Sequence, residues 1–405
     1  MIIGLAENDV RELVQTVLPA DHPGDAWPEA FARAAWSAII EPGDGVAGLL
    51  VARLGPVAAL EAVVAQTPVA GLLRQLGETG AISADLGAEQ LEAALARWRP
   101  RLSSAEAVAG LRRAAAVGAR LLTPDSERWP LGLDDLGAHA PMALWYRGRD
   151  QALTGIDDAI ALVGARAATG YGEHVAMEAS AGLVDRGHAI ISGAAYGIDG
   201  MAHRAALAGS GNTLAFLAGG VDRFYPSGHD ALLTRISHEG AVLAELPCGA
   251  APSKWRFLQR NRLIAAVSAA TVVLEAGTRS GSLNTAGHAA ALGRPVGAVP
   301  GPVTSAASAG CHRLLREFDA VCVTNAAEMS ELVRPVGAQP ELVGYRDADQ
   351  TRVLDALGRT PITIAEVARR SGLAPEAVTA ALGVLELEGL AETTATGWRR
   401  AARAR

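Results

Sequence analysis

The spacing of hydrophobic positions along the chain changes near residue 110. Before that point, segments 28–40, 45–55 and 88–102 repeat apolar residues every three and four positions, with glycine and proline between them. That spacing places the apolar side chains on one face of a helix. We therefore predict a helical N-terminal domain over residues 1–110.

From about residue 158 to 325, short and continuous apolar runs alternate with helical segments. Each run ends in or near glycine or proline; the runs are 159–166, 187–195, 212–220, 241–247, 270–277 and 295–301. Apolar strands that alternate with helices are typical of a parallel sheet that is covered on both faces. The sequence therefore predicts an α/β fold, a Rossmann-like doubly wound and mostly parallel sheet, over residues 111–330.

The C-terminal part predicts two further elements. Residues 331–348 hold prolines and glycines without a period, which indicates a linker. From residue 349 to 405 the pattern gives two helices, a turn at Gly372, a third helix and a closing segment that alternates around Gly397. This order is that of a helix-turn-helix followed by a hairpin, so we predict a winged-helix domain.

Composition and charge limit the classes of function. The net charge of −7 means that any anion site is a local basic patch in an acidic molecule. The three cysteines form no CxxC pair, which argues against a disulfide framework and a zinc site, and no other metal or cofactor is expected. The first residues lack the pattern of a signal peptide and no apolar stretch reaches the length of a membrane span, so we expect a cytoplasmic protein.

Three loops that follow predicted strands combine glycine with basic or hydroxyl side chains. Ligands of doubly wound sheets bind outside the carboxyl ends of the strands, and helix N-termini attract anions. The loops therefore predict a phosphate site at one edge of the sheet. Their candidate residues are Gly164, Arg166, Ser192, Gly193, Gly197, Arg279, Ser280, Gly281 and Ser282.

A fourth candidate is the basic and aromatic segment 253–269. It carries Lys254, Arg256, Arg260 and Arg262, with Trp255 and Phe257 between them. Cationic side chains follow phosphates and an aromatic ring stacks on a base, so this pattern favours single-stranded nucleic acid. The alternative is a solvated helix face whose aromatic residues lie in the core.

Two other sites fit the loops less well. The loop after residue 163 lacks the G-x-G-x-x-G spacing of a dinucleotide site, and the second strand runs into Ser192 and Gly193 instead of an acid. Asp199 and His203 are four positions apart and could form a metal pair or part of a catalytic triad. We favour a helix cap and a histidine on the helix face.

Taken together and in order, these segments resemble the DNA processing protein A family, also called DprA or Smf. The resemblance spans residues 118 to about 315 and rests on the motifs "VGAR", "SGAAYGIDGMAHRAAL", "LAGGVDRFYP", "FLQRNRLIAAVS" and "EAGTRSGSLNTAGHAAALGRPVGAVPG". It implies a non-enzymatic, homodimeric protein that binds single-stranded DNA, protects incoming strands in natural transformation and helps load the RecA recombinase. It also implies an N-terminal domain of sterile-alpha-motif or degenerate helix-hairpin-helix type. The DNA contacts implied are the loop residues above with Lys254, Phe257, Arg260 and Asn261.

Two alternatives remain at this point. Related nucleoside-monophosphate phosphoribohydrolases use a glutamate after a glycine-rich loop, but here the helix after the loop begins with no acid and Glu275 precedes the loop. A transcription factor would use the winged helix to read duplex DNA. Its expected recognition helix, 374–389, carries no lysine or arginine, so we expect that domain to contact a protein or to regulate the sheet domain.

Overall fold

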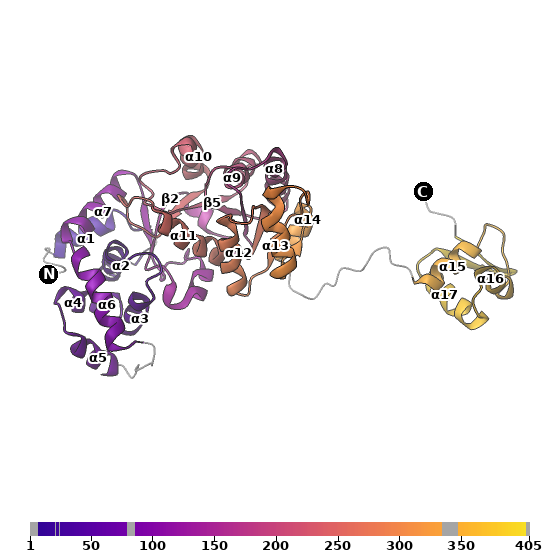
Figure 1. The fold of residues 1–405 in the computed structure, drawn as a ribbon, viewed down its shortest axis with the longest axis horizontal. Helices are drawn as coiled ribbons and strands as arrows, with labels where there is room; N and C mark the ends of the chain where they lie inside the picture. The colour runs from indigo at the N-terminus through magenta and orange to yellow at the C-terminus, as the bar shows by residue number, and fades with distance from the viewer. Residues whose placement is uncertain (1–6, 21, 24, 79–85, 334–346, 402–405) are drawn as a thin grey trace. The chain divides into compact units, whose positions relative to one another are not determined.

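The computed structural model describes residues 7–20, 22–23, 25–78, 86–333 and 347–401. The chain divides into two compact units, residues 1–334 and 335–405 (Figure 1). The first unit holds the sheet and the N-terminal helices, and the second holds the winged helix. The predicted linker, 331–348, lies mostly outside the described residues.

The first unit is built on a nine-stranded sheet with the order β1-β2-β6-β5-β4-β3-β7-β8-β9. β1 and β2 pair antiparallel with each other, β2 pairs antiparallel with β6, and the pairs from β6 to β9 are parallel. This confirms the predicted Rossmann-like, mostly parallel sheet. The strands are β1 (Arg120–Leu122), β2 (Leu144–Gly148), β3 (Ile160–Gly164), β4 (Ile190–Ser192), β5 (Thr213–Leu217), β6 (Ala241–Ala244), β7 (Ala270–Glu275), β8 (Val296–Ala298) and β9 (Val321–Cys322).

The strand order reverses at β3. From β3 the chain builds outward through β4, β5 and β6, and then returns to place β7, β8 and β9 on the other side of β3. The loops after β3 and β7 therefore diverge to opposite faces of the sheet. Such a switch point leaves a crevice at the carboxyl ends of the strands, where ligands bind in this class of fold.

Helices cover both faces of the sheet. Neighbouring residues on one strand face opposite layers: Leu162 packs in the core under α8 and α9, whereas Val163 packs in the core under α11 and α12. Both faces are buried, which is why the strands read as continuous apolar runs. The covering helices are α8 (Gly170–Val184), α9 (Ile198–Ala208), α10 (Asp230–Glu239) and α14 (Ala326–Glu331) on one face, and α11 (Lys254–Val267), α12 (Ser282–Ala291) and α13 (Ala309–Glu317) on the other.

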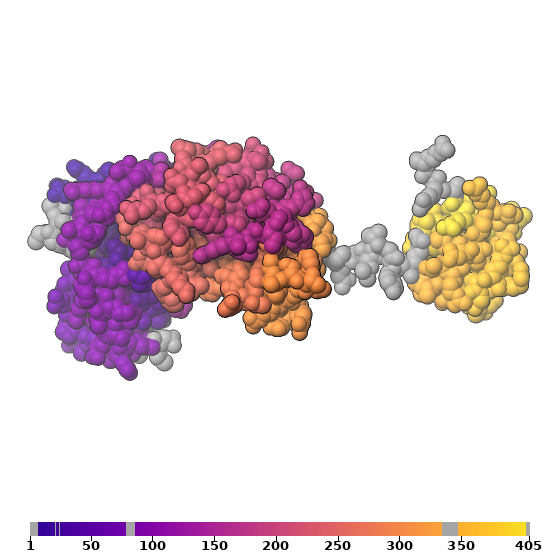
Figure 2. All heavy atoms as spheres, turned by 45° about the horizontal axis from the view of Figure 1, so that its top comes forward, coloured from indigo at the N-terminus to yellow at the C-terminus, as the bar shows by residue number. Residues whose placement is uncertain are grey.

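The N-terminal helices share a core with the sheet. The indole of Trp145 on β2 donates to Ser37 Oγ at 3.2 Å, and the N–H of Leu121 donates to the carbonyl of Val17 at 2.8 Å. In Figure 2 the indigo and violet atoms of the N-terminal part lie directly against the rest of the first unit. The helices are α1 (Glu7–Gln15), α2 (Trp27–Ile39), α3 (Gly45–Leu54), α4 (Pro56–Val64), α5 (Val69–Glu78), α6 (Ala88–Trp98) and α7 (Ser104–Ala116), so the predicted boundary at residue 110 falls inside α7.

Short 3₁₀ helices fill several connections: η1 (Arg99–Arg101), η2 (Leu131–His139), η3 (Asp150–Leu153), η4 (Ser227–His229) and η5 (Ala306–Ser308). Among the described residues, no single helix has the length and apolar character to cross a membrane. α3 and α4, which meet at a bend of 112°, pass that test only as a pair and only by length and composition.

The second unit has the predicted order of a winged helix. Three helices, α15 (Ala348–Ala356), α16 (Ile364–Ser371) and α17 (Pro375–Leu387), precede the hairpin of β10 (Ala391–Thr394) and β11 (Gly397–Arg400). Gly372 ends α16 with a φ of +70°, a left-handed conformation that glycine adopts without strain. The turn that the sequence predicted at this residue is therefore present.

Candidate nucleic-acid interface

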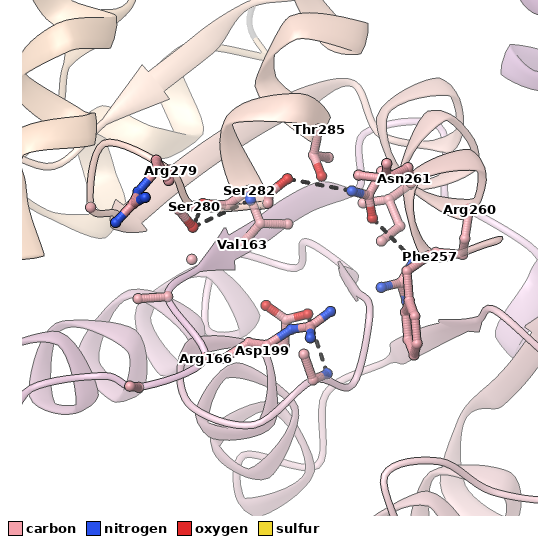
Figure 3. A pocket seen from close by; sticks show the side chains of 18 of the residues that line it. Val163, Arg166, Asp199, Phe257, Arg260, Asn261, Arg279, Ser280, Ser282 and Thr285 are labelled. Atoms are coloured by element: carbon pink, nitrogen blue, oxygen red, sulfur yellow. Dashed lines mark hydrogen bonds between the residues drawn. The ribbon is translucent and has the colours of Figure 1, made fainter. Parts of the chain in front are cut away.

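A groove of about 940 Å³ lies at the switch point of the sheet. Its walls are the loops after β3 and β7 and the first turns of α11 and α12, whose side chains face a common space in Figure 3. Predicted site residues from three separate segments meet here. Those that line the groove are Gly164, Arg166, Lys254, Phe257, Arg260, Asn261, Arg279, Ser280, Gly281 and Ser282.

Three cations of the groove are available to a ligand. Arg166, Lys254 and Arg279 are exposed, and none of them forms an ion pair with a described residue. Lys254 is the first residue of α11, and Ser282 is the first of α12, so two helix N-termini also border the groove. Free cations and the positive ends of helix dipoles both favour a bound polyanion.

An aromatic pair occupies one side of the groove. The guanidinium of Arg166 lies 5.2 Å from the ring centroid of Phe257, and the Tyr225 ring lies 5.5 Å from the same ring. Tyr225 is 50% exposed. Sequence reasoning missed Tyr225, although the adjacent aromatic residues "FY" after a glycine-ended strand were a signal that could have identified it. A flat, partly exposed ring beside free cations can stack on a base.

Arg260 forms the floor of the groove. It is 6% exposed, and its Nη1 donates to the carbonyls of Gly193, at 2.8 Å, and of Phe216. Burial lowers the pKa of Arg260 to about 10, an effect that Asp199 opposes, so the side chain stays cationic at neutral pH. Arg260 therefore supplies positive charge to the groove while it joins the ends of two strands. Arg260 lines the groove as predicted for a DNA contact, and a direct contact with DNA stays a prediction.

The loop after β4 has a different role from the predicted one. Ser192 is fully buried and its hydroxyl donates to the carbonyl of Leu162 at 2.6 Å. The N–H of Gly193 donates to Asp199 Oδ2 at 3.2 Å, and a Cβ at Gly193 would meet the Arg260 guanidinium. The structure thus corrects the assignment of Ser192 and Gly193 as direct DNA contacts, because their polar groups are used within the protein.

Gly197 also serves packing and does not line the groove. Its φ is +73°, a conformation that favours glycine. A Cβ atom added there would lie 2.3 and 2.6 Å from the carbonyl oxygens of Ala165 and Arg166, so there is no room for a side chain. This close approach holds the start of α9 against the loop that carries Arg166. Gly197 therefore helps to position the Arg166 loop and is not itself part of the groove lining.

The basic residues of α11 divide between three environments. Arg256 pairs with Glu41, with Nη2 to Oε1 at 2.7 Å, and Arg262 forms a two-pronged pair with Glu245, at 2.8 Å for each contact. Only Lys254 stays exposed at the groove. The expectation that the whole run follows a nucleic acid is therefore wrong for Arg256 and Arg262, which hold α11 in place.

The carboxylates of this region are also engaged within the fold. Glu275 is 2% exposed and accepts from the N–H of Thr169 at 2.8 Å and from its hydroxyl at 2.5 Å. Glu275 thus stabilises the start of α8 and does not line the groove. Asp199 does line it, but its Oδ2 accepts the N–H of Ala195 at 3.3 Å, and burial raises its pKa. Within the described chain, no three His, Cys, Asp or Glu side chains gather to hold a metal ion.

His203 is a buried histidine and not a partner of Asp199. Thr213 Oγ1 donates to the Ile190 carbonyl at 2.9 Å, so it accepts the hydrogen bond from the His203 Nδ1–H group, at 2.7 Å. The His203 Nε2 atom has no partner among the described residues. Burial lowers the pKa of His203 to about 3. The less favoured alternative, a metal pair or part of a triad with Asp199, is therefore not formed by these two side chains.

This buried histidine predicts a pH dependence of stability. In the unfolded chain the His203 imidazole has a pKa of 6.5 and binds a proton below that pH. In the folded chain it binds the proton only near pH 3, so a lower pH favours the unfolded state. We expect the free energy of unfolding to fall by up to about 1.4 kcal/mol per pH unit from this group as the pH is lowered through that range. Urea unfolding of His203→Gln should show a flatter profile, whereas the exposed His238→Gln should keep the wild-type slope.

The comparisons with known proteins agree with this architecture. Residues 120–334, which hold the sheet and the whole groove, match the family model of DNA recombination-mediator protein A. The chain belongs to this family, also called DprA or Smf. Residues 335–396 match the model of the DprA winged-helix domain, which confirms the winged-helix prediction.

The matches to individual DprA and Smf proteins cover more of the chain than the sheet domain alone. The chain is 49% identical over 303 residues to the putative DNA processing protein DprA of Mycobacterium tuberculosis, covering 70% of this chain and 77% of that protein. It is 35% identical over 296 residues to protein Smf of Escherichia coli, covering 70% and 78%. The X-ray structure of DprA from Streptococcus pneumoniae superposes with a TM-score of 0.58 at 28% identity, covering 75% of this chain and 96% of that one.

Proposed function

We propose that this DprA-family chain binds single-stranded DNA in the groove at the switch point of its sheet. The observation that carries the proposal is the meeting of Arg166, Lys254 and Arg279 with the Phe257 ring around one groove. The cations would neutralise successive phosphates, and the ring would stack on a base that is not paired. A duplex hides its base faces, so this arrangement favours a single strand.

The cellular role that we propose is based on the family to which the chain belongs. The names of the relatives, DNA processing proteins, and of the family model, a DNA recombination mediator, support a function in DNA processing. We propose that the chain works as a homodimer, protects incoming strands during natural transformation and helps load RecA on them. Following RecA filament formation on a single strand, with and without this protein, tests the last step.

We also propose that the groove binds DNA and is not the active site of an enzyme that hydrolyses DNA or nucleotides. Glu275, which precedes the glycine-rich loop, is buried and bonded to Thr169. The groove carboxylate Asp199 is held by backbone N–H groups beside the loop after β4. Release of free base from a nucleoside monophosphate by the purified protein would contradict this part of the proposal.

The winged helix is proposed to contact a protein. Its third helix, α17, carries no lysine or arginine and exposes Val384 and Leu387, at 38% and 90%. Apolar side chains three positions apart lie on one helix face, which suits a protein surface better than a DNA backbone. Sequence-specific binding of this unit to duplex DNA would contradict the assignment.

The decisive experiment compares matched oligonucleotides. Fluorescence anisotropy with a labelled oligo-dT and with a duplex of equal length, each at two salt concentrations, measures preference and charge dependence together. We expect the single strand to bind more tightly and its affinity to fall with salt. Equal affinity for both, or no salt dependence, would contradict the proposal.

Phe257→Ala tests the stacking contact separately from charge. Loss of one base stack should weaken single-strand binding by about 1–3 kcal/mol, and the slope of log affinity against log salt should stay unchanged because no cation is removed. Phe257→Tyr keeps a ring at the same place and should bind nearly as well as wild type. If Phe257→Ala binds as wild type does, the ring has no role in binding.

A further inference from the structure

A second hollow lies on the other side of α11 from the groove. It encloses about 760 Å³ between α3, α6, η2 and the start of α11. Trp255 and Gln259 line it from α11, Gln90 and Arg97 line it from α6, and Arg101 lines it from η1. None of these side chains lines the groove at the switch point.

The helix α11 separates the two hollows and presents one face to each. Successive residues of an α-helix are turned by about 100°, so residues four apart share a face and neighbours do not. Lys254, Leu258 and Asn261 line the groove, whereas Trp255 and Gln259 line the second hollow. A strand that leaves the groove over Lys254 therefore reaches Trp255 within the same helical turn.

Trp255 differs from the other tryptophans of the chain. It is 57% exposed, while Trp27, Trp36, Trp98, Trp129 and Trp145 are each at most 7% exposed, and Trp398 lies half-buried in the other unit. An indole offers the largest stacking surface of any side chain, and Trp255 lines the hollow together with Gln90 and Gln259. Gln90 Oε1 accepts the N–H of Gly87 at 2.8 Å, so Gln90 would meet a base through its amide N–H groups. Amides can donate to and accept from the edge of a base.

Two arginines, Arg97 and Arg101, and two carboxylates, Glu41 and Asp44, line the second hollow. Arg101 Nη1 and Arg256 Nη2 share Glu41 Oε1 at 2.8 and 2.7 Å, and Arg97 contacts Asp44 Oδ2 at 3.1 Å. Arg256 does not line the hollow, so the charges that line it balance, and a phosphate would have to draw Arg97 away from Asp44. Asp44 also accepts the indole N–H of Trp98 on the same oxygen, at 2.9 Å. Arg97 itself is 54% exposed and can turn to a phosphate.

We infer that this hollow is a second nucleotide site for the strand held in the groove. Trp255 stacks on a base, Gln90 and Gln259 bond its edge, and Arg97 neutralises the adjoining phosphate. The inference rests on the proposed function, because continuity with the groove over Lys254 is what identifies the occupant as the same strand. The alternative occupant, a segment of a partner protein, is an outcome of the test below.

The test compares two lengths of oligo-dT with the full-length chain. One of about 6 nucleotides fills the groove only, and one of about 20 nucleotides reaches both sites. Trp255→Ala is expected to weaken binding of the longer strand about tenfold, the loss of one stacked base, and to leave the shorter strand unchanged. Trp255→Phe, which keeps a ring, should lie close to wild type on both lengths.

Tryptophan fluorescence gives an independent readout. The longer strand should quench the exposed Trp255, and the quenching should disappear in Trp255→Phe. The inference is overturned if Trp255→Ala weakens the binding of both oligonucleotides equally or of neither. It is also overturned if the fluorescence stays unquenched when DNA is bound. A segment of a partner protein would then be the remaining candidate for the hollow. Failure of the proposed function looks different, because Phe257→Ala and wild type would then bind the short strand equally.

Discussion

The triple variant Arg166→Glu/Lys254→Glu/Arg279→Glu is expected to bind oligo-dT on the order of 100-fold more weakly than wild type at low salt. Each of these cations is exposed and free of ion pairs with described residues, so each can neutralise one phosphate. A single-strand contact contributes about 0.7 to the slope of log affinity against log salt, so the magnitude of that slope should fall by about 2. Anisotropy titrations at several salt concentrations measure both quantities.

A matched variant separates this local effect from overall charge. Arg53→Glu/Arg74→Glu/Arg112→Glu changes the net charge by the same amount at exposed arginines that do not line the groove. It should keep most of the wild-type affinity and slope. If both triple variants weaken binding equally, the effect is one of net charge and the groove assignment fails.

Glu245→Ala is expected to lower the free energy of unfolding of the first unit by about 3–5 kcal/mol. The side chains of Arg262 and Glu245 are only 4% and 9% exposed, so removal of the carboxylate leaves a buried guanidinium without its counter-charge. The change should also loosen the N-terminal helices, because the N–H of Gly43 donates to Glu245 Oε1 at 3.3 Å. Urea unfolding followed by tryptophan fluorescence reports on this unit, which holds all tryptophans except Trp398.

Two further variants show whether burial is the cause. Glu317→Ala breaks an exposed pair with Arg313 of the same 2.8 Å length and should change stability by less than about 1 kcal/mol. The double variant Glu245→Leu/Arg262→Met removes both buried charges and should recover most of the loss. If Glu245→Ala costs no more than Glu317→Ala, the buried pair does not hold α11 as the geometry indicates.

The location of the groove could be predicted because the periodicity of the sequence is strong. The runs that became β3, β4 and β7 are continuous and end in glycine, which identifies parallel strands and places their following loops at one edge. Local pattern alone thus brought Arg166 and Arg279, more than one hundred positions apart, to one site. It did not place Tyr225 beside Phe257, because the tyrosine ring reaches Phe257 from a loop whose path no period describes.

The sequence by itself determined the two covered faces of the sheet, the winged helix and the edge that carries the glycine-rich loops, because these follow from the spacing of apolar residues and glycines. Only the tertiary structure decided which polar groups remain free. Arg256, Arg260 and Arg262 look alike in one run, yet their partners Glu41, Phe216 and Glu245 come from distant parts of the chain. The availability of a charge depends on the carboxylates and carbonyls that folding brings next to it, and short-range patterns carry no information about them.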